Sequence, residues 1–573
     1  MVDILSFIAA QIPEHLFLLF EIGMMIILAG IIGYILKLFK QPLIPSYIIA
    51  GIVLGPLGIG LIKNNETLLV LSEIGVAFLL FFAGLEIHLK KLKEVGKSAL
   101  FAGSFQMAIL FALAFFISTW LGINNKIPIY VGLVVAFSST MVVLKLLADK
   151  RELNSLHGRI VIGILLIQDI AAIIALTVLT TDLSIISMSI ALLKALGFAI
   201  VAFILSKIIN PVFKIAARNT ELLLLTSLTL LFIFAVGSYI AELSLIIGAF
   251  FAGVALANSD YKTEIQGKIL PLRDFFAVIF FVALGMQLTL ISKQFLILLL
   301  VLIVLVMIIK PLVIMLLVRG VGGYSKRTSF LTGNSLAQTS EFSLIIATIG
   351  LSLGYINQGL FSALVLLTVL TMGATTYLIK YDKQLFGLFG WPLNIFKKMK
   401  SREEILEYSS PEKKKIIIFG CHRMGSLFLR YFAKRKKEIL TVDYDPGIIR
   451  SLNEKKISCI YGDLTNSEVL ERINFKDVDL IISTIPDIDG NAMLVKKIKQ
   501  VNKKIIFIAT AERISNAEQL YKLGADYVLL PKVISGEVGF NLAKKLMKNR
   551  RNITKMKNEQ KEYLENIHHL LYD

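Results

Sequence analysis

The stretch Gly163-Ile-Leu-Leu-Ile-Gln-Asp-Ile-Ala-Ala172 places one carboxylate in the middle of an apolar run. The run extends over residues 159–181, and about 20 apolar residues are enough to cross the hydrocarbon core of a bilayer as a helix. A charged side chain at the bilayer centre costs at least about 2.5 kcal/mol on insertion scales, so such residues face a cavity or a partner. Asp169 therefore predicts a membrane helix that borders water, an ion or a base.

Apolar runs of this kind fill the chain from residue 16 to about residue 380. Charged residues make up 18% of the chain, where a soluble protein has about 25%. We expect an all-α polytopic membrane domain over residues 1–380. It would have about thirteen spans, centred on 16–37, 43–60, 67–88, 98–121, 128–147, 159–181, 185–207, 221–241, 243–258, 274–291, 294–318, 328–353 and 358–380.

The basic residues in the connecting loops predict the orientation of this domain. With the N-terminus outside, the inner loops carry eighteen lysines and arginines, and the outer loops carry only Lys63, Lys126 and Lys293. Cytoplasmic loops are the ones enriched in basic residues. We therefore expect a multi-pass protein of the cell membrane with its C-terminal part in the cytoplasm. The same loops account for the net charge of +19, so nucleic acid is not an expected partner.

A second charged residue lies inside a span, at Lys310 in Val306-Met-Ile-Ile-Lys-Pro-Leu-Val313. An acid on one span and a base on another could offset each other's cost by pairing. The pair could simply join two helices, but a buried ion pair stabilises a protein poorly compared with apolar packing. An ion path through the membrane is the preferred interpretation.

Two spans are interrupted by polar residues, in Val135-Ala-Phe-Ser-Ser-Thr-Met141 and in Thr332-Gly-Asn-Ser-Leu-Ala-Gln-Thr-Ser-Glu-Phe342. Unwound backbone at membrane depth is tolerated only where it lines a cavity or is buried in protein. The two interruptions precede the sixth and thirteenth spans, at matching positions near the ends of two halves. This pattern predicts inverted repeats with two crossing broken helices. For either stretch alone, a helix-packing face of small residues is the alternative.

The composition changes after Tyr381. We expect a basic linker over residues 381–412, a nucleotide-binding domain over 413–543 and a charged helical tail over 544–573. Short apolar runs alternate with amphipathic stretches, which predicts a Rossmann-like doubly wound sheet. Its six strands are expected at 416–419, 439–442, 457–461, 480–483, 505–508 and 527–530.

The loop Gly420-Cys-His-Arg-Met-Gly425 joins the first of these strands to its helix. The dinucleotide-binding loop is G-x-G-x-x-G, and His422 takes the place of its middle glycine. Arg423 could compensate electrostatically for the altered phosphate seat. Asp443 ends the second strand, where an acid that binds ribose belongs. No catalytic acid–base pair stands beside the loop, so we expect no enzyme.

Six motifs follow one another along the membrane part, at Ile49–Pro56, Glu73–Glu86, Phe137–Thr140, Gln168–Asp169, Phe280–Met286 and Gln338–Phe342. Their order and spacing resemble those of the monovalent cation:proton antiporter-2 family, and in particular its Kef-type members with a C-terminal RCK (TrkA-N) domain. The resemblance implies a homodimer that exchanges K⁺, or alternatively Na⁺, for H⁺ by alternating access.

The resemblance also implies roles for individual residues. Asp169 would be the carboxylate that binds either the transported cation or protons, and Gln168 its neutral neighbour. Lys310 would be the basic partner. The other residues expected to line or support the site are Ser139, Thr140 and Glu341.

The cytoplasmic part resembles an RCK domain through Tyr461-Gly-Asp463 and Ser483-Thr-Ile-Pro-Asp487. The resemblance implies an adenine nucleotide, NAD(H) or AMP, as a regulatory ligand and no catalytic cofactor. It would be bound by Gly420, His422, Arg423, Met424, Gly425, Asp443 and Asp463. The loop that is acidic in glutathione-controlled members is mixed in sign here, at Asp260–Lys268, so glutathione control is not carried over from the resemblance and stays open.

Three other functions are alternatives to cation/proton exchange. An RCK-gated potassium channel, or another ligand-gated potassium efflux pathway, would need a selectivity filter such as TVGYG, and no such string occurs. A membrane redox enzyme would need ligands for a second cofactor, and no such pattern appears. A sensor without transport leaves Asp169 and Lys310 unexplained.

Overall fold

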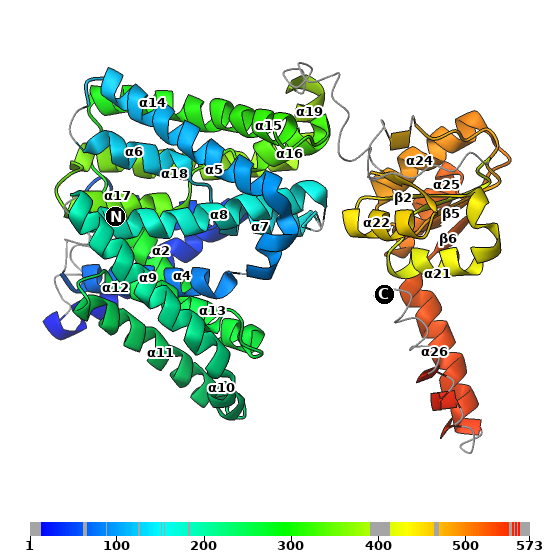
Figure 1. Cartoon of the computed structure of the whole chain (residues 1–573), viewed down its shortest axis with the longest axis horizontal. Coiled ribbons are helices and arrows are strands. Elements are labelled where there is room, and N and C mark those ends of the chain that lie inside the picture. Colours follow the sequence, from blue (N-terminus) through cyan, green and yellow to red (C-terminus); the bar gives the residue numbers. More distant parts are fainter. Residues whose placement is uncertain are drawn as a thin grey trace. The chain divides into compact units, whose positions relative to one another are not determined.

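The computed structural model describes residues 13–60, 66–87, 89–123, 126–150, 152–153, 155–181, 184–389, 413–462, 464, 469–470, 472–548, 553–554, 556–558 and 560–561. Two compact units make up the chain (Figure 1). The first is helical and ends at residue 398, and the second begins at residue 399.

Each expected span has a helical counterpart in the first unit. The helices are α2 (Glu14–Leu38), α3 (Ile44–Leu54), α4 (Glu66–Glu86), α5 (Leu89–Trp120), α6 (Ile127–Ala136), α7 (Thr140–Asp149), α8 (Leu156–Leu179), α9 (Ile185–Ile208), α10 (Asn210–Ala216), α11 (Thr220–Ile240), α12 (Leu245–Leu256), α13 (Lys262–Met286), α14 (Lys293–Val304), α15 (Lys310–Gly320), α16 (Lys326–Ser335), α17 (Glu341–Ser352) and α18 (Gln358–Lys380). Within the described residues, nine helical stretches are long and apolar enough to cross a membrane, and α3, α12 and α17 are shorter apolar helices. The number of thirteen spans stays a prediction.

The helices pack into two bundles. In the first bundle, α4 packs on α12 and α13, α13 on α3, and α12 on α9 and α11. In the second, α5 packs on α6 and α15, α15 on α16, and α18 on α14, α16 and α17. Small residues let membrane helices approach closely. A Cβ on Gly84 of α4 or on Gly253 of α12 would meet the backbone of the other helix at 2.2 or 2.0 Å.

Both expected interruptions are breaks between two helices. Helix α6 gives way to α7 at Phe137–Ser139, and α16 gives way to α17 at Leu336–Ser340. A serine hydroxyl restarts each helix by accepting a backbone N–H, from Val142 at Ser139 and from Phe342 at Ser340, as an N-cap does.

The two breaks touch one another. The Ser138 hydroxyl donates to the Leu336 carbonyl at 3.1 Å, and the Gln338 amide donates to the Ser139 carbonyl at 3.3 Å. The expectation that two interrupted helices cross is therefore met at this point.

The second unit contains a six-stranded parallel sheet in the order β3-β2-β1-β4-β5-β6. The strands are β1 (Ile416–Phe419), β2 (Ile439–Asp443), β3 (Ser458–Tyr461), β4 (Leu480–Ser483), β5 (Ile506–Thr510) and β6 (Tyr527–Leu529). The α-helices that accompany them are α21 (Arg423–Tyr431), α22 (Pro446–Glu454), α24 (Ile488–Val501), α25 (Ile514–Leu523) and α26 (Pro531–Lys548). This is the doubly wound strand order, so the Rossmann-like prediction is confirmed.

Two segments differ from the expected boundaries. The start of the expected linker forms α19 (Asp382–Phe389), whose Leu385 and Phe386 pack against Met315, Phe330 and Leu331. These apolar contacts attach the segment to the helical unit. Helix α26 extends away from the sheet (Figure 1) and runs through the expected start of the tail at residue 544.

Candidate functional site

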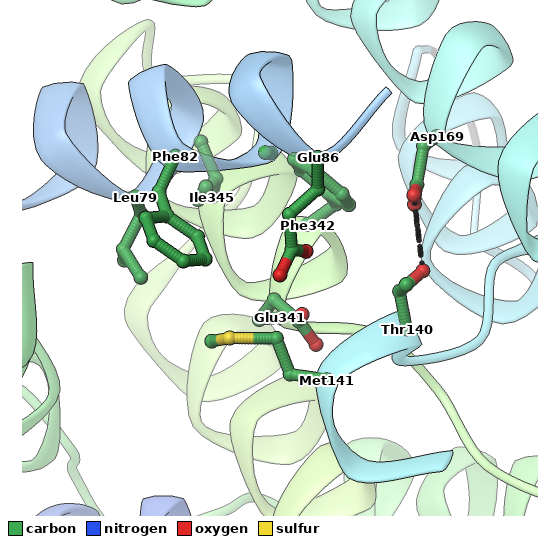
Figure 2. Close-up of a pocket in the computed structure, with 10 residues that line it drawn as sticks. Leu79, Phe82, Glu86, Thr140, Met141, Asp169, Glu341, Phe342 and Ile345 are labelled. Atoms are coloured by element: carbon green, nitrogen blue, oxygen red, sulfur yellow. Dashed lines mark hydrogen bonds between the residues drawn. The ribbon is translucent and has the colours of Figure 1, made fainter. Parts of the chain in front are cut away.

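Asp169 projects from α8 toward the first residue of α7. The Thr140 hydroxyl lies 2.9 and 3.1 Å from its two carboxylate oxygens and donates to this carboxylate. Figure 2 shows this contact together with the Glu86 and Glu341 side chains, which come from α4 and α17 and line the same pocket. Three carboxylates from three helices therefore share one pocket inside the membrane unit.

The pocket has a volume of about 390 Å³, including its opening to solvent. Only about 30 Å³ of this space admits the centre of a water-sized sphere, and one water molecule needs about 10 to 15 Å³ by that measure, so the pocket has room for about two water molecules or for a small cation in their place. The remaining wall is formed by Leu79, Phe82, Ala83, Met141, Phe342 and Ile345. Within the described residues, no group of three or more acidic, histidine or cysteine side chains is arranged to hold a metal ion.

The Asp169 carboxylate keeps most of its hydrogen-bonding capacity free. An ionised carboxylate can accept about four hydrogen bonds, and in the described residues only the Thr140 hydroxyl donates to it. One oxygen of Glu341, Oε2, is buried without a hydrogen-bond partner among the described residues. Thr140 and Glu341 also begin α7 and α17, and a helix N-terminus stabilises negative charge. The pocket can therefore hold carboxylates that await a cation or a proton.

Lys310 lies elsewhere than expected. Its ammonium is fully buried and donates to the carbonyls of Val135, Phe137 and Gln338 at 3.0, 2.7 and 2.7 Å. An ammonium has three donors, and these three carbonyls use them all. Among the described residues no ion pair joins it to Asp169, so the expected pairing is corrected: Lys310 fastens the two helix breaks to each other.

Local features of the backbone explain why Lys310 binds these carbonyls. Carbonyls at the end of an α-helix lack intrahelical partners and carry partial negative charge, and unwound backbone inside a membrane needs internal partners. A π-helical turn at Leu305–Ile309 comes directly before Lys310, and Pro311 follows it. Proline lacks the N–H that would continue the regular ladder.

Gln168 and Ser139 also form hydrogen bonds with the backbone at the helix break between α6 and α7. The Gln168 side-chain carbonyl accepts the Ser138 N–H at 2.9 Å, and Ser139 caps α7. Of the six expected site residues, Asp169, Thr140 and Glu341 line the pocket, and Gln168, Ser139 and Lys310 hold the backbone behind it. Sequence reasoning missed Glu86, although it ends an apolar run and one of the quoted motifs.

Comparison with known proteins shows which family this architecture belongs to. A family model described as sodium/hydrogen exchanger, transmembrane, matches residues 23–380, more than half of the chain. The chain belongs to the sodium/hydrogen exchanger family. It is a multi-pass membrane protein, and a TrkA-N domain model matches residues 416–531.

Relatives of this exchanger include the glutathione-regulated potassium-efflux system protein KefC of Salmonella arizonae, 28% identical over 496 residues, which cover 84% of this chain and 77% of the relative. KefC of Escherichia coli O17:K52:H18 is 27% identical over 497 residues, with the same coverage. Among solved structures, the sodium proton antiporter MjNhaP1 from Methanocaldococcus jannaschii has a TM-score of 0.52 at 16% identity, covering 66% of this chain and 99% of that chain. At that identity the likeness shows a shared fold.

In the TrkA-N domain, the glycine loop lies at the carboxyl ends of β1 and β4, where the strand order reverses and ligands of such sheets bind. Gly420 has φ +80°, and a Cβ on Gly425 would lie 1.8 Å from the Gly420 carbonyl oxygen. The Thr484 hydroxyl donates to the same carbonyl at 2.8 Å. Both glycines are therefore required for this tight turn.

Asp443 is buried beneath the loop, and burial raises the pKa of its carboxyl. Its oxygens accept the N–H groups of Cys421 at 2.6 Å and of Asp445 at 2.8 Å. Each carboxylate oxygen can accept a further hydrogen bond, so the residue fits a ribose hydroxyl. His422 is exposed and Met424 half-buried. The Arg423 side chain and Asp463 lie outside the described residues.

Proposed function

We propose that this chain is a secondary antiporter that exchanges a monovalent cation for protons at the Asp169 pocket. The observation that carries the proposal is a partly buried carboxylate that accepts from one hydroxyl among the described residues and faces a pocket that two further carboxylates line. A carboxylate does not hold a proton and a metal ion at the same time. Release of one on binding of the other couples the two gradients.

The pocket lies between the two bundles. Phe82 and Glu86 come from α4 of the first bundle, and Thr140 and Glu341 belong to the broken helices of the second. Sliding of one bundle against the other would change the side from which the pocket is reached. Movement of this kind is how transporters with broken helices alternate access.

Potassium is the proposed cation, because the KefC relatives are named for potassium efflux, and sodium is the alternative. We further propose one-for-one exchange, a homodimer in the cell membrane and a cytoplasmic TrkA-N domain. Regulation by an adenine nucleotide, NAD(H) or AMP, is supported by the tight Gly420–Gly425 turn and the buried Asp443. The roles predicted for Asp169, Gln168, Ser139, Thr140 and Glu341 belong to the same proposal.

The test is exchange in proteoliposomes that contain a pH-reporting dye, with potassium and then sodium added outside. The wild-type protein is expected to move protons against the added cation, and Asp169→Asn is expected to match empty liposomes while remaining folded. Glu242→Gln, which removes an exposed carboxylate, is the matched control and should behave as wild type. Proton flux in Asp169→Asn, or cation flux without proton flux as in a channel, would contradict the proposal.

A further inference from the structure

Arg273 of α13 touches two side chains of the pocket wall. Its guanidinium carbon lies 4.1 Å from the centre of the Phe82 ring, and its Nη1 lies 3.3 Å from the Met141 sulfur. Phe82 belongs to the first bundle and Met141 to α7 of the second. The Arg273 side chain is 11% exposed, so it is a nearly buried cation at the boundary between the bundles.

The charges around the pocket are unequal in sign. The wall holds Glu86, Asp169 and Glu341, and no basic side chain is among the described residues that line it. The positive charge of Arg273 interacts electrostatically with Glu341, and both Glu86 and Glu341 act on Asp169. Arg273 is therefore placed to offset part of the negative charge.

Two other groups face Arg273, one from its own helix and one from α3. The Asp274 carboxylate, next to it on α13, accepts from Nε at 3.0 Å and from Nη2 at 2.6 Å. Tyr47 of α3 interacts electrostatically with both Arg273 and Asp274. Asp274 is 59% exposed, and solvent weakens an exposed ion pair. Arg273 therefore keeps part of its effect on the pocket.

We propose that Arg273 sets the pH range of exchange, as a positioning residue whose positive charge stands behind the pocket wall. This inference rests on the proposed exchange function. A nearby positive charge favours the ionised form of a carboxyl group, so protons leave at a lower pH. The same charge repels the transported cation, so neither ion is held too tightly to be released.

The test is the rate of exchange against pH in proteoliposomes, for the wild type and for three variants. Arg273→Gln is expected to move the profile to higher pH by about half to one unit, because an opposite charge next to a carboxyl shifts its pKa by about 1 to 3 units and this one acts through a wall. Arg273→Lys keeps the charge and should follow the wild type. Asp274→Asn removes the competing negative charge and should move the profile to lower pH by a smaller amount.

Opposite shifts in Arg273→Gln and Asp274→Asn would support the inference. A profile for Arg273→Gln that superimposes on the wild type would overturn it, and so would an equal shift in Arg273→Lys, since packing would then be responsible. If Arg273→Gln moves no ions, the cation-dependent rise in Tm of the detergent-solubilised full chain is followed against pH, and an unshifted midpoint would overturn the inference.

The wild type and Asp169→Asn separate the two proposals. Absence of exchange by the wild type, with a profile no different from Asp169→Asn, would refute the function itself. Exchange by the wild type with no shift in Arg273→Gln would refute the role of Arg273 alone.

Discussion

Two charged side chains lie inside the same membrane unit, and their hydrogen bonding differs. The Lys310 ammonium donates its three hydrogen bonds to three backbone carbonyls at 2.7 to 3.0 Å. Among the described residues, Asp169 accepts from a single hydroxyl, and its side chain lines a pocket. A buried charge whose hydrogen bonds are all made has nothing left with which to bind an ion.

The difference teaches that burial of a charge inside a membrane does not by itself identify a transport residue. A transport residue is identified by the hydrogen-bonding capacity that its charged group has not used. On this argument, removal of Lys310 should damage the fold, and removal of Asp169 should damage exchange. The following changes test that division, beginning with the largest expected effect.

Lys310→Met is expected to lower the free energy of unfolding by about 3 kcal/mol or more, because one buried acceptor left without a donor costs about 1 to 3 kcal/mol and three would be left here. The carbonyls of Val135, Phe137 and Gln338 would lose their donor. Thermal unfolding of the detergent-solubilised protein measures the change. Lys194→Met, at a lysine that is one-third exposed and paired with Glu242, is the control with little expected effect.

Asp169→Asn should leave that same unfolding transition close to the wild-type one, because the amide can still accept from Thr140. A large loss of stability in Asp169→Asn, or a wild-type melting curve in Lys310→Met, would break the comparison between the two charges.

Thr140→Val removes the donor to Asp169 and keeps a side chain of similar shape. Hydrogen bonds to charged groups contribute about 1.5 to 3 kcal/mol, so we expect the apparent KM for the cation to change by about tenfold or more. Concentration dependence of exchange in proteoliposomes measures it. Thr348→Val, where the hydroxyl bonds only within α17, is the control, and an equal change there would argue against a role at the site.

A third charged side chain, Glu152 between α7 and α8, extends the comparison of Lys310 with Asp169. Glu152 lies 3.2 Å from the Lys150 ammonium and 3.3 Å from the His157 imidazole. Burial alone would raise the pKa of this carboxyl, but hydrogen bonds and charges from His157 and Lys150 outweigh it and lower the pKa to about 2. Lys150 also pairs with Asp382 at the start of α19.

A lowered pKa in the folded state contributes stability above the ordinary carboxyl pKa, and this contribution is lost as the pH falls toward about 2. Glu152→Gln is therefore expected to lower the free energy of unfolding by about 1 to 2 kcal/mol at pH 7, a value reduced for the partial exposure of the group. The gap from the wild type should narrow as the pH is lowered to 3 in thermal unfolding. A gap that stays constant over this range would show that the charge of Glu152 contributes nothing.

Much of the fold follows from patterns that are local in the chain. Apolar runs of about 20 residues predict membrane helices, and the polar stretches at 137–140 and 332–341 correctly predict the two helix breaks. The six short apolar runs correctly predict the parallel sheet. Asp169 stands out because one charge in an apolar run is expensive, and that cost is visible without any knowledge of neighbours.

Patterns that are local in the chain could not predict contacts between distant segments. Lys310 looked like a counter-ion because a mid-membrane base implies a partner, and the sequence alone could not show that three carbonyls, two of them 175 and 173 residues away, would serve. Glu86 lies near the end of the expected span 67–88, and nothing in the sequence shows that it lines the same pocket as Asp169 and Glu341. Helix α19 fell within the expected linker because it is only eight residues long, too short for a membrane span, and the partners of its Leu385 and Phe386 lie far away in the sequence, on α15 and α16.

The sequence by itself determined that this chain has a helical membrane unit with two interrupted helices, a Rossmann-like sheet and one acid within an apolar run. Those features depend on composition and spacing, which act over a few turns of chain. Only the tertiary structure decided which charged side chain has all of its hydrogen bonds made and which keeps the capacity to bind an ion. The reason is that a hydrogen bond reaches about 3 Å in space, and which groups come within that distance is decided by packing rather than by separation along the chain.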